Sequence, residues 1–141
     1  MDKIVVGVDC SPHSAAALRW AAEDGAAKDV PVVAVMAWSY LDQHGPDGKK
    51  AKEFDPQWSA EKALDNLDAF VQETLGDAAT GVQTEVLNDL PARAILDAAS
   101  DATTVVVGAR GLGGFKGLLL GSVSRQVVDH APCTVVVARG A

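Results

Sequence analysis

The sequence predicts an α/β domain whose doubly wound, five-stranded parallel sheet carries helices on both faces. Short Val-rich apolar runs, typical of strands covered on both faces, alternate with segments of helical periodicity. Crossovers between parallel strands are right-handed, so this alternating order favours helices on both faces. The length of 141 residues, 48% of them apolar, suits one hydrophobic core, and we expect residues 1–141 to form a single domain.

Five runs are strand candidates. Ile4 to Val8, Val32 to Trp38 and Thr103 to Val107 are continuous apolar runs, which indicates buried strands. Val82 to Leu87 interleaves polar with apolar residues, as expected of an edge strand with one face in solvent. The fifth run, Thr134 to Ala138, is short and apolar, and as an uncovered edge it would invite pairing.

Each helical segment has its own start or stop signal. Ser11 as N-cap and Pro12 at the first position open one helix. A longer helix is expected over about residues 57–75, with Gly76 as its stop. Asp89-Leu90-Pro91 and Gly121-Ser122 open two more. The residues expected to face the core are Leu18, Ala21, Ala22, Gly25, Ala60, Ala63, Leu64, Leu67, Phe70, Val71, Leu75, Ala94, Ile95, Ala98, Val123, Val127 and Val128.

Composition argues against several classes of partner. Twelve Lys and Arg against nineteen Asp and Glu give a net charge of −7, which repels nucleic acid and anionic bilayers. The apolar runs are shorter than the ~18 residues of a membrane span, and the amino-terminal residues lack the layout of a secretory signal. Cys10 and Cys133 lack partners at metal-ligand spacing, so we predict neither disulfide nor metal site and expect a cytoplasmic protein.

The predicted topology limits the search for a site to a few loops. In doubly wound sheets, ligands bind beyond the carboxyl ends of the strands, where the winding reverses. The candidate loops follow Val8, Trp38 and Val107. The second loop, about residues 39–55, is long and is either a solvated excursion, which we favour, or a lid over a ligand.

The loop after Val107 has the composition of a phosphate-binding turn. Five glycines lie between residues 108 and 117, directly before a helix start at Gly121. Glycines let a ligand approach the backbone, and consecutive N–H groups with a helix amino terminus favour an anion. Ser122, Ser124 and Arg110 add polar donors. Neither a Walker A string nor a G-x-G-x-x-G dinucleotide fingerprint is present.

The spacing of this loop, Gly108-x2-Gly111-x9-Gly121-Ser122, resembles that of the universal stress protein family, specifically its ATP-binding branch. The likeness covers the whole chain and includes the first two strands and the ending His130 to Val137. The resemblance implies a Rossmann-like sheet of order 3-2-1-4-5 that binds ATP, with Mg²⁺ or Mn²⁺ held by the phosphates. It also implies a homodimer joined through residues 134–138.

The resemblance assigns a nucleotide site by motif position. The loop from Gly108 to Gly114 would wrap the ribose and phosphates, the start of the last helix would meet the phosphates, Asp9 would lie at the nucleoside side, and Ala37 would meet the adenine. The complete predicted set is Gly7, Val8, Asp9, Ala37, Gly108, Ala109, Arg110, Gly111, Leu112, Gly113, Gly114, Gly121, Ser122, Val123 and Ser124.

Several of these side chains also have a simpler structural interpretation. Asp9 could cap the first helix, and Arg110 could be a solvated surface charge. Cys10 could simply pack, which we favour, or its position at a helix start could lower its pKa and make it an oxidant sensor. We assign no catalysis to His13, His44 or His130, because none pairs with a nucleophile as in a triad.

These observations favour a nucleotide-dependent regulatory module without strong catalytic activity. The sequence offers an anion-binding turn but no evident activated base. The alternatives are a slow ATPase or nucleotidyl-transferring enzyme, for which Asp9 is the candidate carboxylate, and a structural dimer that binds no ligand.

Overall fold

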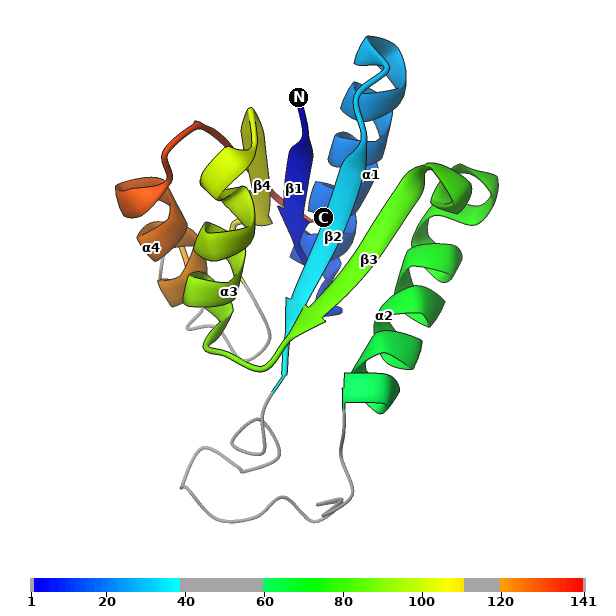
Figure 1. Cartoon of the computed structure of the whole chain (residues 1–141), viewed down its shortest axis with the longest axis horizontal. Coiled ribbons are helices and arrows are strands. Elements are labelled where there is room, and N and C mark those ends of the chain that lie inside the picture. Colours follow the sequence, from blue (N-terminus) through cyan, green and yellow to red (C-terminus); the bar gives the residue numbers. More distant parts are fainter. Residues whose placement is uncertain (1, 39–59, 111–119, 141) are drawn as a thin grey trace.

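The computed structural model describes residues 2–38, 60–110 and 120–140. Within them, five parallel strands form one sheet in the order β3-β2-β1-β4-β5 (Figure 1). The strands are β1 Ile4–Gly7, β2 Val32–Ala37, β3 Val82–Leu87, β4 Thr104–Gly108 and β5 Thr134–Ala138. This order confirms the predicted doubly wound topology, and β3, with its alternating exposure, is an edge strand as expected.

Helices cover both faces of the sheet (Figure 1). The α-helices are α1 Pro12–Lys28, α2 Ala60–Leu75, α3 Pro91–Ala98 and α4 Ser122–His130, and the 3₁₀ helices are η2 Gly76–Gly81 and η3 Ala99–Asp101. The predicted N-cap is confirmed, since the Ser14 N–H donates to the Ser11 hydroxyl at 3.2 Å. Gly76 ends α2 with a φ of 58°. Residues 57–59 of the predicted second helix lie outside the described residues.

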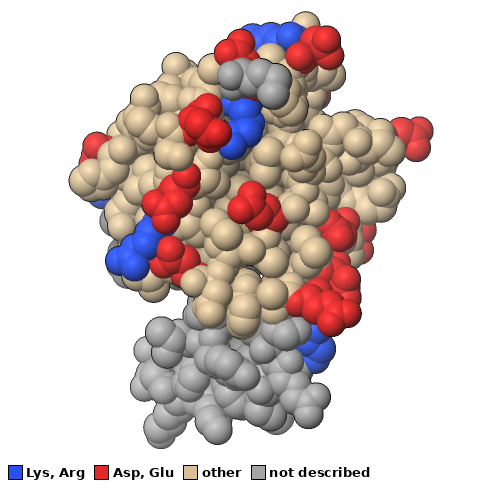
Figure 2. Space-filling model, viewed as in Figure 1, with Lys and Arg blue, Asp and Glu red and all other residues tan. Residues whose placement is uncertain are grey.

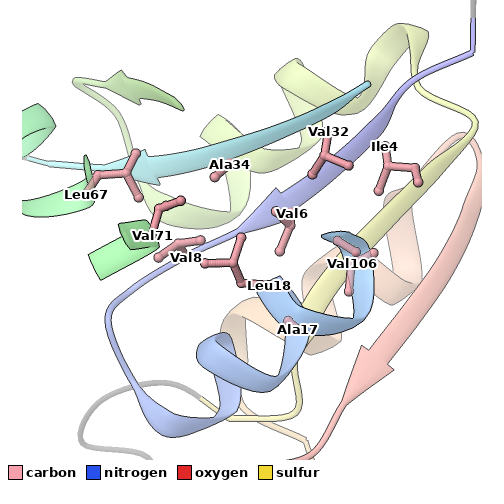
Figure 3. Close-up of a cluster of buried hydrophobic side chains, with 11 residues drawn as sticks. Ile4, Val6, Val8, Ala17, Leu18, Val32, Ala34, Leu67, Val71 and Val106 are labelled. Carbon is pink, nitrogen blue, oxygen red and sulfur yellow. The ribbon is translucent and has the colours of Figure 1, made fainter. Parts of the chain in front are cut away.

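The central strands divide the core into two layers. Side chains at even positions, such as Ile4, Val6 and Val106, pack with α1 and α2 (Figure 3). Side chains at odd positions, such as Val5 and Val105, pack with α3 and α4 on the opposite face. Adjacent residues of a strand point to opposite faces, so each face of the sheet has its own apolar layer.

Two residues expected to face the core do not. Val128 is 44% exposed, because the buried side of α4 runs through Ser124 and Val127, and the next residue turns about 100° away. Ala60, the first residue of α2, is exposed.

The amino-terminal ends of β1 and β4 are joined by contacts of Lys3. The Thr103 N–H and hydroxyl both donate to the Lys3 carbonyl, at 2.9 and 3.0 Å. The Lys3 Nζ lies 2.7 Å from the Asp101 Oδ1, and this hydrogen bond and charge lower the pKa of the Asp101 carboxyl. These contacts fix the register of the two strands whose opposite ends form the candidate site.

Candidate functional site

The candidate site lies where the winding of the sheet reverses, at the carboxyl ends of β1 and β4. These strands are neighbours, with Ile4 opposite Thr104 and Val6 opposite Val106. The chain leaves β1 toward α1 on one face and leaves β4 toward α4 on the other. Ligands of doubly wound sheets bind in the crevice beyond such a point. The structure therefore brings the turns that follow these two strands to one end of the sheet.

The turn after β1 is organised by Asp9. The Ser11 N–H donates to the Asp9 Oδ1 at 3.0 Å, and the Asp9 N–H donates to the Ser14 hydroxyl at 3.4 Å. Between them, Cys10 has a φ of 64°, in the left-handed region. The Asp9 carboxylate thus anchors the entrance to α1, which supports the plainer of its two interpretations as at least one of its roles.

The surroundings of Cys10 do not favour an oxidant sensor. The residue is exposed, but desolvation by surrounding protein atoms raises the pKa of its thiol, and the charges of Asp9 and Glu73 raise it further. A reactive cysteine needs a lowered pKa. The direction of this shift therefore argues against the oxidant-sensor interpretation.

Ala109 joins the two ends of the glycine-rich loop. Its N–H donates to the Ala138 carbonyl at 2.7 Å, and its own carbonyl accepts from the Gly121 N–H at 2.7 Å and the Ser124 hydroxyl at 2.8 Å. Ala109 is also buried, with 2% of its surface exposed. Ala109 is therefore a buried residue whose backbone N–H and carbonyl are both hydrogen-bonded, and it holds Gly121 and Ser124 of the next helix start beside the end of β4.

The start of α4 presents backbone donors at this place. Its N-cap is Gly121, which forms no side-chain cap hydrogen bond, and the first N–H groups of a helix have no partner within that helix. Ser122 is exposed, and the Gln126 Nε2 donates to its hydroxyl at 3.3 Å. Ser124 is 3% exposed, with its hydroxyl directed at the Ala109 carbonyl, so its side chain positions the loop.

The other predicted residues occupy neighbouring strand ends. Val8 is buried, and its N–H donates to the Val35 carbonyl at 2.9 Å. Ala37 ends β2 opposite Leu87. Arg110 follows β4 and is half-buried, and Val123 is half-buried against the apolar layer of α3 and α4. Gly111, Leu112, Gly113 and Gly114 lie outside the described residues, as does the loop over residues 39–55.

Two glycines of the predicted site are explained by packing. A Cβ at Gly7 would lie 2.5 Å from the Ile95 Cδ1, and a Cβ at Gly108 would lie 2.7 Å from the backbone carbon of His13. Both strands thus end where a helix approaches closely. At Gly108 the blocking atoms include backbone, so glycine is needed there for the packing of α1, whereas at Gly7 a Cβ would force the Ile95 side chain of α3 to shift.

His13 is a residue of this region that the sequence analysis missed. Its Nδ1 accepts a hydrogen bond of 2.7 Å from the Gly140 N–H, across 127 positions of sequence. A Cβ at Gly140 would lie 2.8 Å from the Pro12 backbone. The available signal in the sequence was a histidine directly after Ser11-Pro12, in the first turn of a helix that follows the turn after β1.

The charged surface matches the acidic composition. On the face shown in Figure 2, acidic side chains predominate, and the basic ones lie singly or beside acidic ones. Among residues 2–38, 60–110 and 120–140, no three His, Cys, Asp or Glu side chains gather as metal ligands. In the same ranges, no helix combines the length and hydropathy that a membrane span requires.

Comparison with known proteins gives consistent results along the whole chain. Residues 1–139 match the profile of the Universal stress protein family. The chain is 35% identical over 145 residues to a universal stress protein of Mycolicibacterium smegmatis, covering 97% of this chain and 48% of the relative. Universal stress protein Rv1996 of Mycobacterium tuberculosis is 37% identical over 142 residues, covering 96% and 43%. The chain thus spans about half the length of these relatives.

Solved structures share the fold. Universal stress protein UspA from Lactobacillus plantarum superposes with a TM-score of 0.74 at 26% identity, covering 98% of this chain and 97% of that one. A universal stress protein from Archaeoglobus fulgidus, in complex with dAMP, gives a TM-score of 0.63 at 25% identity, with 98% of both chains covered. By its sequence match and its sheet order, the chain belongs to the universal stress protein family.

Proposed function

We propose that the chain is one universal stress protein domain that binds ATP, with Mg²⁺ or Mn²⁺ on the phosphates, and acts as a nucleotide-dependent regulatory module. The observation that carries this proposal is the closed base of the glycine-rich loop, where Ala109, Gly121 and Ser124 hold the start of α4 beside the end of β4. The dAMP bound to the Archaeoglobus relative supports an adenine nucleotide as the ligand class. A cytoplasmic location stays a prediction from the sequence.

The described donors suit the phosphates of a nucleotide. The first N–H groups of α4 and the exposed Ser122 hydroxyl favour an anion, and the helix dipole adds to this preference. The described residues do not gather a metal-ligating cluster, so a divalent ion would be held by the phosphates themselves. Such an ion would offset the repulsion between a triphosphate and a protein of net charge −7.

The proposal does not include strong catalytic activity. In the described part of the site, Asp9 is the candidate carboxylate, and its Oδ1 already accepts a hydrogen bond from the Ser11 N–H. A hydrolase needs a group that orients the attacking water. We therefore expect ATP turnover far below the ordinary enzyme range of about 1–1000 per second. Turnover within that range, abolished by Asp9→Asn, would establish the enzymatic alternative.

The proposal also includes a homodimer formed through β5, residues 134–138. This strand is an edge of the described sheet, and its residues are half-buried or exposed. Unpaired strand edges promote association with a second chain. Sedimentation of the purified chain at micromolar concentration tests this, and a monomer there would contradict it.

The nucleotide site is tested by placing a charge where the phosphates are expected. Ser122→Asp puts a carboxylate on the first turn of α4, where an acidic residue favours the helix. Like charges that lie close together repel each other by some kilocalories per mole, so we expect the affinity for Mg-ATP to fall at least about tenfold. The midpoint temperature of thermal unfolding should stay the same or rise. Isothermal titration and thermal unfolding measure the two quantities.

Ser100→Asp is the matched control. Ser100 is exposed in η3, which precedes β4 at the opposite end of the sheet, so it adds the same charge away from the site. The control should keep wild-type affinity. Equal affinity of Ser122→Asp and Ser100→Asp would remove the start of α4 from the site.

A further inference from the structure

A hydrogen bond between His13 and Gly140 joins two segments far apart in sequence. The Gly140 N–H donates to the His13 Nδ1 at 2.7 Å in a partly buried position. The backbone of Gly140 also lies against the first turn of α1, since a Cβ there would come within 2.8 Å of Pro12 and 2.9 Å of the His13 N. The segment after β5 therefore packs against the start of α1.

The backbone of the same residue lies next to the proposed nucleotide site. The backbone carbon of His13 lies 2.7 Å from the position that a Cβ of Gly108 would take, and Gly108 is the last residue of β4. The next residue, Ala109, donates to the Ala138 carbonyl two positions before Gly140. Two hydrogen bonds thus tie the segment at residues 138–140 to the base of the glycine-rich loop and to α1.

The direction of the hydrogen bond defines the chemical state of the imidazole. A backbone N–H can only donate, so the His13 Nδ1 must be unprotonated and the neutral ring must carry its hydrogen on Nε2. An imidazolium has hydrogens on both ring nitrogens and accepts no hydrogen bond. Protonation of His13 is thus incompatible with this contact.

The surroundings of His13 contain few other titratable groups. The strands that contact α1, β1, β2, β4 and β5, carry none in their described spans. The charged residues that flank these elements in sequence are Arg110 after β4, Arg139 after β5 and Asp9 before α1. From α2, which also packs on α1, the charge of Glu73 reaches the neighbouring Cys10, and η2, which packs on α1 as well, carries Asp77. We therefore attribute pH dependence of this contact to the imidazole itself.

We infer that His13 is a pH-sensitive positioning residue: its neutral imidazole holds the Arg139–Gly140 segment on α1 and so keeps the turns after β1 and β4 in place, and its protonation releases that segment. The role in positioning rests on the proposed nucleotide function, whereas the His13–Gly140 contact can be measured without nucleotide.

The contact is tested by the hydrogen-exchange protection of the Gly140 amide in the ¹⁵N-labelled chain. Between about pH 7.5 and about pH 5.5, we expect the protection factor, corrected for intrinsic exchange, to fall about tenfold in the wild type. His13→Asn offers a carbonyl near the Nδ1 position that cannot be protonated in this range, so its protection should not change with pH. His130→Asn, at the exposed end of α4, is the control and should show the same fall in protection as the wild type.

Constant protection in the wild type, or the same fall in His13→Asn, would overturn the inference. An NMR scalar coupling through the hydrogen bond, between the Gly140 nitrogen and the His13 Nδ1, can be measured in the wild type without any variant. It should be present near pH 7.5 and absent near pH 5.5. Its absence at the higher pH would contradict the contact, even if the variants do not fold.

The positioning role is tested by nucleotide affinity. Phosphates also titrate in this range, so wild type, His13→Asn and His13→Ala are compared with each other at each pH. We expect His13→Ala to bind Mg-ATP about threefold to tenfold more weakly near pH 7.5 and His13→Asn to restore wild-type affinity. Equal affinity of His13→Ala and wild type would overturn the positioning role. If the wild type does not bind Mg-ATP, the proposed function is overturned. The hydrogen-exchange result would still show whether the His13–Gly140 contact depends on pH.

Discussion

At the residue scale, Cys10 shows the cost of a side chain in a turn suited to glycine. Its φ of 64° places the Cβ near the following carbonyl, which costs about 1–2 kcal/mol in an L-residue. Glycine at this position would remove the strain. It would also increase the conformational entropy of the unfolded chain, which lowers the stability by about 0.4–1 kcal/mol. We expect Cys10→Gly to raise the free energy of unfolding by roughly 0.5–1 kcal/mol in urea denaturation.

Cys133→Gly is the matched comparison. Cys133 is not among the described residues with positive φ and packs against the layer of α3 and α4, so its replacement should lower the free energy of unfolding. A loss of stability in both variants would show that the turn at Cys10 is not strained.

At the element scale, α1 contains a glycine at a position where intrinsic helix preference alone would favour alanine. A Cβ at Gly25 would lie 2.5 Å from the Val32 Cγ2 and 2.8 Å from the Val30 carbonyl oxygen, and that backbone oxygen cannot move aside as a flexible side chain can. Alanine gains about 1 kcal/mol of helix preference over glycine. The overlap should exceed this gain, so we expect Gly25→Ala to lower the free energy of unfolding by about 1–3 kcal/mol.

The neighbouring residue provides the control for α1. Ala26 is exposed, so Ala26→Gly should lose only the helix preference, about 1 kcal/mol, in the same denaturation experiment. The two substitutions run in opposite chemical directions and should both destabilise. If Gly25→Ala is more stable than the wild type, α1 can shift away from β2.

At the scale of the whole molecule, the proposed dimer depends on the outward backbone groups of β5. The Ala138 carbonyl accepts from Ala109, so the polar groups of Ala138 face β4, and those of Val137 face the open edge. Val137→Pro removes an outward N–H and leaves the ladder to β4 intact. We expect this variant to sediment as a monomer while its circular dichroism matches the wild type. A persistent dimer would place the interface elsewhere.

The sequence analysis predicted the architecture well because its signals are local. Val-rich runs, Ser11-Pro12 and Gly76 each act within a few residues, and they located the strands, the N-cap and the helix end. The contact of His13 with Gly140 depends on how distant segments meet, which spacing does not report. The same limit explains Val128, since Val127 and Val128 are adjacent in a helix of nine residues, and the sequence does not report which of the two faces the sheet.

For the candidate site, the sequence predicted which elements meet there, but not the contacts that their side chains make. The reversal point and the Gly121-Ser122 start follow from strand order and composition. The inward hydroxyl of Ser124 and the raised pKa of Cys10 depend on neighbours brought by other elements, Ala109 and Glu73.

The division of the core by odd and even strand positions has a consequence for how the domain can change. Among the described residues, the backbone of the sheet separates the side chains of the two layers, so we expect a volume change on one side to be absorbed by the helix pair on that side. Each half of the interior can thus be repacked, in evolution or by design, without matching adjustments in the other.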